Sequence, residues 1–110
     1  MLVYGLNTCS ICKKALKALE ASGAEFEFRD VRAAPLSEAE LAVLIAEFGD
    51  RLIDRTTNDW RGLSDWLKHS EAEDQLAAKP KLMARPIIHH EGSYYLGWDE
   101  AVQKEVLPAQ

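Results

Sequence analysis

The two cysteines of this chain, Cys9 and Cys12, are the residues whose type and spacing are best suited to chemistry. A Cys-x-x-Cys pair indicates a redox-active or a metal-binding site, because both kinds of site use the thiolate. At a helix N-terminus, backbone N–H groups and the helix dipole favour the thiolate over the thiol. We therefore predict that Cys9 is a nucleophile and that Cys12, one turn further along, can close a disulfide with it.

A zinc site is the main alternative for this pair of cysteines. It would need two more ligands, for which His89 and His90 are the candidates. Adjacent residues of a strand point to opposite faces, so these two imidazoles do not easily converge on one ion. A phosphatase-type Cys-x5-Arg loop also fails, because alanine, not arginine, stands at the required distance after each cysteine. We expect no bound metal.

Arg85 and Pro86 open a β-prone run and have two possible roles. A proline at the start of a strand is most often a turn or edge device. The functional alternative is a cis peptide beside the cysteine, which would leave backbone groups free to hold an extended thiol substrate. In that case Arg85 would supply positive charge to the thiolate. The residues alone leave both possibilities open.

A β-α-β unit is expected to position Cys9. The apolar run at residues 2–4 predicts a buried strand that stops at Gly5, and helical spacing of apolar residues follows over residues 10–22. Gly23 is a natural helix terminator. Residues 25–29 then alternate and predict a second strand, parallel to the first.

The middle of the chain is predicted to be helical. Ser37-Glu38-Ala39-Glu40 has the spacing of a capping box and is followed by apolar residues at helical spacing as far as Gly49. Trp60, Leu63 and Leu67 predict another short helix. Ser70-Glu71-Ala72-Glu73 repeats the capping-box spacing and predicts a further helix that ends before Pro80.

The last third of the chain predicts a hairpin and a helix. The runs at residues 87–90 and 94–96 are β-prone, and Glu91-Gly92-Ser93 forms the turn between them. A final helix is expected over residues 99–106. The order β-α-β, helices, β-β-α predicts an α/β, thioredoxin-like (glutaredoxin-like) core with a mixed four-stranded sheet. We expect one domain, residues 1–110, with a helical insertion at approximately residues 34–80.

Composition excludes several classes of protein. The chain has 110 residues, 47% hydrophobic, and a formal net charge of −5, with lysines and arginines scattered among acidic residues. There is no basic footprint for direct nucleic-acid binding. The apolar start is too short for a signal peptide, and no run reaches membrane-spanning length. We expect a cytoplasmic protein without membrane contact, and a monomer.

Four short motifs occur in order along nearly the whole chain: Tyr4-Gly5-x-x-x-Cys9, Trp60-Arg61-x-Leu63, Arg85-Pro86-Ile87 and Gly97-Trp98-Asp99-Glu100. Together they resemble the arsenate reductase ArsC/Spx family, especially its YffB-like branch. The resemblance implies a thioredoxin-like fold with a helical insertion, a nucleophile at Cys9 and a cis-proline at Pro86. It also implies electrons from glutathione and glutaredoxin.

The resemblance is incomplete at the oxyanion site. Arsenate reductases of this family use three arginines around the cysteine, and two of them carry over, to Arg55 and Arg85. No arginine follows Arg85, so the third is missing and tight arsenate binding is in doubt. The Cys-x-x-Cys pair is similar to the Spx branch, whose members sense thiol oxidation and bind RNA polymerase. The chain lacks that branch's extended C-terminal tail, which disfavours a regulatory role.

We predict a thiol-disulfide oxidoreductase in which Cys9 attacks and Cys12 or glutathione resolves. The alternatives are a glutaredoxin-linked arsenate reductase and an Spx-like redox-sensing regulator that binds RNA polymerase. No cofactor is expected to be bound, since glutathione serves as co-substrate. The partners would be glutathione or glutaredoxin and a small-molecule or protein disulfide. The predicted catalytic residues are Cys9, Cys12 and Arg85, and the predicted substrate-binding residues are Arg55, Thr8, Ser10 and Pro86.

Overall fold

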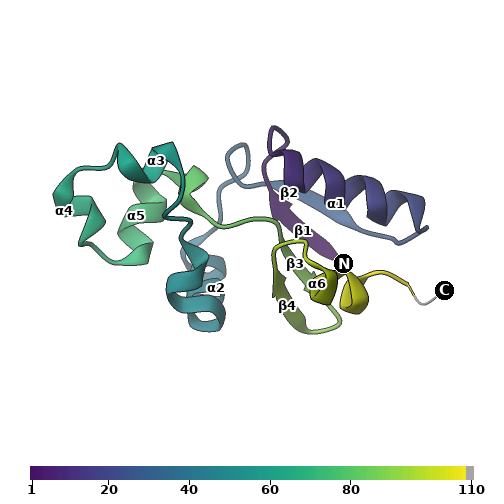
Figure 1. Ribbon diagram of the computed structural model, residues 1–110. Helices are drawn as coiled ribbons and strands as arrows, with labels where there is room; N and C mark the ends of the chain where they lie inside the picture. Colours follow the sequence, from purple (N-terminus) through teal and green to yellow (C-terminus); the bar gives the residue numbers. More distant parts are fainter. Residues whose placement is uncertain (109–110) are drawn as a thin grey trace. The chain divides into compact units, whose positions relative to one another are not determined.

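The computed structural model describes residues 1–108 as two compact units (Figure 1). The first unit comprises Met1–Val31 and the chain from Arg85 onward, and the second comprises Arg32–Ala84. The first contains β1 (Leu2–Gly5), α1 (Ser10–Ala21), β2 (Glu27–Asp30), β3 (Ile87–His90), β4 (Ser93–Leu96) and α6 (Glu100–Val106). The second contains α2 (Glu38–Phe48), η1 (Gly49–Leu52), α3 (Asn58–Arg61), α4 (Asp65–Lys68), α5 (Ala72–Ala78) and η2 (Pro80–Leu82). The single-domain organisation stays a prediction.

The first unit is built on a four-stranded sheet in the order β2-β1-β3-β4. β1 pairs with β2 in parallel, as the β-α-β unit requires, and the other two pairings are antiparallel. β2 begins two residues later than the alternating pattern suggested and continues to Asp30. The mixed sheet confirms the predicted α/β, thioredoxin-like fold class.

One face of this sheet carries the core of the first unit. Val3 and Ile88 are partners in the β1–β3 register, so their side chains lie on the same face. They form one buried cluster with Leu19 of α1 and with Val102 and Val106 of α6. Both helices therefore pack on the same face of the sheet, and this packing fixes the start of α1 close to the end of β1.

The β3–β4 hairpin closes through a tight turn. Glu91 and Gly92 both have positive φ, at 51° and 81°, which matches the right-handed twist of the flanking strands. The turn thus has two central residues, and Ser93, predicted to lie in the turn, pairs with His90 as the first residue of β4. The last helix, α6, begins as predicted after Asp99, whose carboxylate accepts the Val102 N–H at 2.9 Å.

The second unit consists of short helices. The capping box predicted at Ser37 is present, because the Glu40 N–H donates to the Ser37 hydroxyl and the Ser37 N–H donates to the Glu40 carboxylate. Ile53 and Met83 form an isolated antiparallel bridge that brings the two ends of the α3–α5 segment together. The core of this unit is made of Leu44, Phe48, Leu52, Ile53, Leu63, Leu76, Leu82 and Met83.

Two predictions in this unit were wrong. The single helix expected from Trp60 to Leu67 is two one-turn helices, α3 and α4, because a new helix starts at Ser64, whose hydroxyl accepts the Leu67 N–H. The second capping box does not form. Glu71 is the N-cap of α5, and the Ser70 hydroxyl instead donates to the Trp66 carbonyl at 2.7 Å. The competing hydrogen bond to the preceding helix removes Ser70 from the cap position.

No helix within residues 1–108 is both long and apolar enough to cross a membrane.

Candidate functional site

Cys9 lies at the N-cap of α1, where β1 passes into the helix. Its backbone is extended (φ −83°, ψ 123°), its N–H donates to the Leu6 carbonyl at 3.1 Å, and its own carbonyl accepts the Lys13 N–H at 3.0 Å. The loop before it is anchored by the Asn7 N–H, which donates to the Asp30 carboxylate at the end of β2. The half-buried Cys9 sulfur is therefore placed at the positive end of the helix dipole.

Cys12 lies in the first turn of α1 with its side chain fully buried. It and Cys9 are both free thiols. The buried position depends on Gly5, the last residue of β1, because a Cβ added to Gly5 would lie 2.6 Å from the Cys12 sulfur. Since real Cβ atoms do not approach that closely, any side chain at position 5 would displace Cys12 or the strand.

The environment of Cys9 favours its charged form. Partial burial raises the pKa of Cys9, but hydrogen bonds from the Cys12 backbone N–H, the Cys12 thiol and the Arg85 guanidinium, together with the Arg85 charge, lower it by more. The net pKa of Cys9 lies below that of an ordinary cysteine. The chemical consequence is a larger fraction of the nucleophilic thiolate at a given pH than an ordinary cysteine has.

The environment of Cys12 favours its neutral form. The pKa of Cys12 is raised to about 11, mainly by burial and further by the hydrogen bond to Cys9 and by the Cys9 charge. The Leu6 backbone N–H and the Arg85 charge lower this pKa, but by less. The two thiols therefore differ in role. Cys12 keeps its proton and donates it in a hydrogen bond to the Cys9 sulfur.

Arg85 and Pro86 reach the cysteines from the other end of the sequence. The bond between them is a cis peptide, as the family resemblance implied, and Pro86 is buried at the start of β3. The Pro86 carbonyl accepts the Gly97 N–H at 2.8 Å. The structure thus brings Arg85 to Cys9 and Cys12, although more than seventy positions separate Arg85 from the two cysteines in the sequence.

The other predicted site residues have different surroundings. Thr8 and Ser10 flank Cys9 on the exposed side of the loop and of the first helical turn. Arg55 belongs to the second unit, where its guanidinium lies over the Trp60 ring, 5.2 Å from the ring centre, and 3.8 Å from the Asp50 carboxylate. Substrate binding by Arg55, Thr8, Ser10 and Pro86 stays a prediction.

Sequence reasoning missed two residues of the site. Gly5 was interpreted as the end of a strand and as part of a family motif, whereas its missing side chain makes room for the Cys12 sulfur. Leu6, which is buried, supplies a backbone N–H to Cys12 and a backbone carbonyl to Cys9. The glycine four residues before Cys9 was the available signal for Gly5, whereas the backbone groups of Leu6 leave no trace in the sequence.

The structure offers no support for the zinc alternative. Within residues 1–108 there is no group of three or more His, Cys, Asp and Glu side chains that could hold a metal ion. His89 stacks on its cross-strand neighbour Tyr94, with ring centres 4.1 Å apart, and His90 lies 3.9 Å from the Glu91 carboxylate.

Comparison with known proteins agrees with the fold and the resemblance. A model of the ArsC family matches residues 4–106. An uncharacterized protein of Haemophilus influenzae is 35% identical over 103 residues, covering 89% of this chain and 90% of the relative. The global transcriptional regulator Spx 2 of Lactococcus lactis is 27% identical over 116 residues, covering 96% of this chain and 85% of the relative.

A solved structure, that of a YFFB protein, superposes with a TM-score of 0.87. It is 22% identical and covers 97% of this chain and 98% of its own length, so it is evidence for the fold. The family model extends over most of the chain and includes both cysteines and the Arg85–Pro86 pair. The chain is therefore a member of the ArsC family.

Proposed function

We propose that this protein is a thiol-disulfide oxidoreductase that uses Cys9 as its nucleophile and glutathione as its source of electrons. The observation that carries the proposal is the lowered pKa of a half-buried cysteine at a helix N-terminus, hydrogen-bonded by a buried thiol and an arginine. A cysteine whose pKa is lowered by a helix N-terminus and a cationic neighbour is typical of catalytic cysteines. Membership of the ArsC family supports a thiol-based redox chemistry.

In the first step the Cys9 thiolate attacks one sulfur of a mixed disulfide between glutathione and a substrate thiol. A new bond forms between Cys9 and the glutathione sulfur, the old S–S bond breaks, and the substrate leaves as a thiolate that takes up a proton. The substrate sulfur leaves with the electron pair of the old S–S bond and is reduced to the thiol level, while Cys9 supplies the pair of the new bond and is oxidised to the disulfide level. Arg85, which donates to the Cys9 sulfur in the free enzyme, keeps the nucleophile charged until it attacks.

The second step is resolution by glutathione or by Cys12. A second glutathione thiolate attacks the Cys9–glutathione disulfide, releases oxidised glutathione and restores the Cys9 thiolate. Alternatively Cys12 attacks Cys9, releases glutathione and leaves a Cys9–Cys12 disulfide that two further glutathione molecules reduce. The first step favours this second route, because it removes the Cys9 charge, which adds to the effect of burial in raising the pKa of Cys12.

The substrate groups would be held by the residues around the sulfur. Thr8 and Ser10 are exposed beside Cys9. Both edges of β3 are already paired, with β1 and with β4, so an extended peptide such as glutathione would be held by the backbone just before the strand, at Pro86. Arg55 is proposed, on the family resemblance, to attract the carboxylates of an anionic substrate. A substrate class of anionic thiols and their disulfides follows from these assignments.

Reduction of hydroxyethyl disulfide with glutathione and glutathione reductase tests the proposal. We expect the full chain to turn over, Cys9→Ser to lose at least about 10³-fold of its rate, and Lys17→Gln on the exposed side of α1 to behave as the wild type. Full activity of Cys9→Ser, or absence of turnover in a wild-type protein whose Cys9 is reactive to iodoacetamide, contradicts it.

Arsenate reduction is a second candidate, favoured by the family and by the presence of Arg55 and Arg85. The missing third arginine argues for weak oxyanion binding. Arsenate-dependent oxidation of glutathione that saturates and requires Cys9 would support it. A rate with arsenate no higher than that of Cys9→Ser would exclude it.

A redox-sensing regulator is a third candidate, favoured by the Cys9–Cys12 pair and by the Spx relative. The disulfide would then be a switch and not a catalytic intermediate. Binding of purified RNA polymerase to the oxidised protein and to Cys12→Ser, which cannot form the disulfide, distinguishes the roles. Equal absence of binding in both excludes the regulator.

A further inference from the structure

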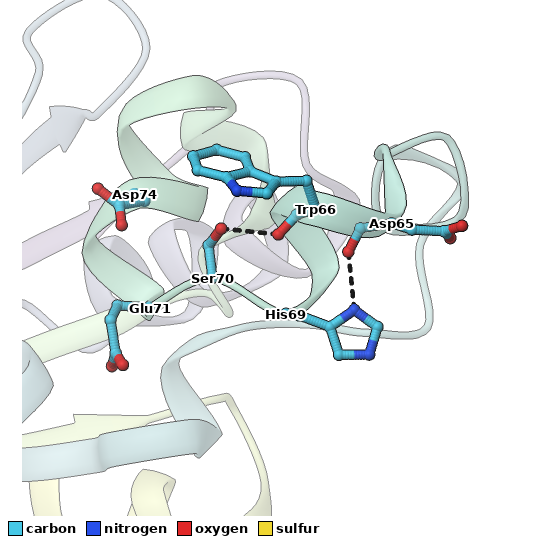
Figure 2. A pocket seen from close by; sticks show the side chains of 6 residues that line it. All are labelled: Asp65, Trp66, His69, Ser70, Glu71 and Asp74. Carbon is cyan, nitrogen blue, oxygen red and sulfur yellow. Dashed lines mark hydrogen bonds between the residues drawn. The ribbon is translucent and has the colours of Figure 1, made fainter.

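The second unit carries an open pocket that has no part in the cysteine chemistry (Figure 2). Its volume is about 520 Å³, and it is formed by α4, the start of α5 and the residues that join them. The lining residues are Asp65, Trp66, His69, Ser70, Glu71 and Asp74. Trp66 is 74% exposed, the highest value among the large hydrophobic side chains of residues 1–108. An exposed indole in a pocket is a feature of binding sites.

The Trp66 ring is displayed from a firmly connected pair of helices. Ser64 caps α4, and the Ser70 hydroxyl donates to the Trp66 carbonyl at 2.7 Å. Gln75, only 2% exposed, donates its side-chain amide to the carbonyls of Leu67 and Lys68 at 2.9 and 3.3 Å. These bonds tie the end of α4 to α5, so the ring is presented by a preorganised surface.

The polar groups around the ring are hydrogen-bond acceptors. Figure 2 shows the Asp74 side chain on the side toward which the indole extends, while the Glu71 and Asp65 carboxylates point away from the ring. The His69 Nδ1 donates to the Asp65 carbonyl at 2.8 Å, which leaves Nε2 as an acceptor in the neutral ring. No lysine or arginine lines the pocket.

Within the described part of the chain, no cationic side chain contacts these carboxylates or the indole ring. Within residues 1–108, neither Glu71 nor Asp74 forms an ion pair, and no guanidinium lies over Trp66. By contrast, the neighbouring aromatic Trp60 is covered by Arg55. An aromatic face in a pocket lined by unpaired carboxylates is complementary to an arginine or lysine side chain.

We propose that the Trp66 pocket binds an arginine or lysine side chain from a basic segment of a partner protein, with the cation over the indole and paired with Asp74, while Glu71 adds negative charge to the lining. The open form of the pocket favours a segment over a free small cation. A lone cation there would stay hydrated and screened by salt, whereas flanking residues of a segment cover the exposed ring. This inference does not rest on the proposed function.

A titration of the ¹⁵N-labelled full chain followed by NMR tests the proposal. The probe is the heptapeptide Gly-Ser-Arg-Gly-Arg-Ser-Gly with blocked ends, and its matched control carries citrulline, which is neutral and nearly isosteric, in place of both arginines. We expect the arginine peptide to shift the Trp66 indole N–H and the amides of residues 64–75, and the citrulline peptide to leave them in place.

Substitutions in the pocket then test which side chains contact the arginine peptide. Trp66→Ala should weaken binding at least about tenfold, and Trp66→Leu should do the same if the ring's π face, and not its apolar area, is recognised. Glu71→Gln combined with Asp74→Asn should weaken it severalfold and reduce its salt dependence. Val43→Ala, which truncates another exposed apolar residue of the same unit, is the control and should bind as the wild type.

Three results would overturn the proposal. Equal shifts with the citrulline peptide would show that the cation is not recognised. Unchanged binding by Trp66→Ala would place the contact elsewhere. Arginine amide that binds as tightly as the heptapeptide would make the pocket a site for small cations and not for a partner segment.

Discussion

The two compact units of this chain are organised by interactions of different range. In the first unit, strand pairing brings Arg85 to Cys9, and the missing side chain of Gly5 makes room for Cys12. In the second unit, α2 and α4 are each started by a cap only three residues from its partner, at Ser37 and Ser64. The chemistry of the first unit therefore depends on packing between distant segments, whereas the surface of the second depends on local hydrogen bonds.

Gly5→Ala is the change that should break the first unit most severely. The added Cβ would lie 2.6 Å from the buried Cys12 sulfur, and overpacking of this kind costs about 1–3 kcal/mol in the free energy of unfolding. Displacement of Cys12 also removes hydrogen bonds from the Cys9 thiolate, so the pKa of Cys9 should rise. Urea denaturation and the pH dependence of iodoacetamide alkylation measure the two effects.

A double-mutant cycle and a matched glycine make this prediction specific. In Gly5→Ala combined with Cys12→Ala the clashing sulfur is absent, so adding the Gly5 change to Cys12→Ala should cost little. Gly62→Ala in the second unit places its Cβ no closer than 3.4 Å to another atom and should change stability by less than about 0.5 kcal/mol. Additive losses in the cycle would refute the contact between position 5 and Cys12.

Cys12 predicts a pH dependence of stability. Because folding raises the pKa of Cys12 to about 11, its neutral thiol adds stability that is complete below the pKa of an unfolded cysteine, about 8.5, and is lost as the pH rises toward 11. Cys9 acts in the opposite sense and at lower pH, since its lowered pKa adds stability as the pH rises toward about 8.5.

The measurement compares the wild type with Cys12→Ala under reducing conditions. Between about pH 8.5 and 11 the unfolding free energy of the wild type should fall by up to about 2 kcal/mol more than that of Cys12→Ala. Parallel curves for the two proteins across this range would show that the Cys12 thiol is not held neutral by the fold.

The sequence predicted local hydrogen bonds better than it predicted packing between distant segments. Signals that act within four residues were interpreted correctly: the capping box at Ser37, the end of α1 before Gly23 and the start of α6 at Asp99. The order of strands and helices followed from these signals, and with it the fold class. The boundaries that failed, at Ser70 and Ser93, are those where one residue has two possible hydrogen-bonding roles.

The site was predicted by residue type but not by geometry. The Cys-x-x-Cys pair indicated a reactive thiol, and Arg85 was proposed as its charge partner, which the pKa shift of Cys9 supports. The spacing of the cysteines did not indicate that Gly5 and Leu6 hold Cys12 in place. Such contacts depend on how β1 packs against α1, which no local pattern encodes.

Arg85 of the first unit and Arg55 of the second are expected to affect the reactivity of Cys9 differently. Arg85 stabilises the Cys9 thiolate directly, so Arg85→Gln should raise the pKa of Cys9 and slow its alkylation at neutral pH severalfold. Arg55 has no part in the pKa of Cys9, so Arg55→Gln should leave alkylation unchanged and raise the KM for glutathione-containing substrates. A shift of the Cys9 pKa in Arg55→Gln, or none in Arg85→Gln, would reverse these roles.

The smallest effects should come from the two serines with the same capping-box spacing in the sequence. Ser37 accepts the Glu40 N–H and caps α2, so Ser37→Ala should cost about 1 kcal/mol in unfolding free energy. Ser70 only donates to the preceding helix, and Ser70→Ala should cost about 0.5 kcal/mol or less. Urea denaturation of both variants measures the difference. Equal losses would mean that Ser70 caps α5 in solution, and that the spacing alone, not the competing bond to Trp66, decides where a helix of this unit begins.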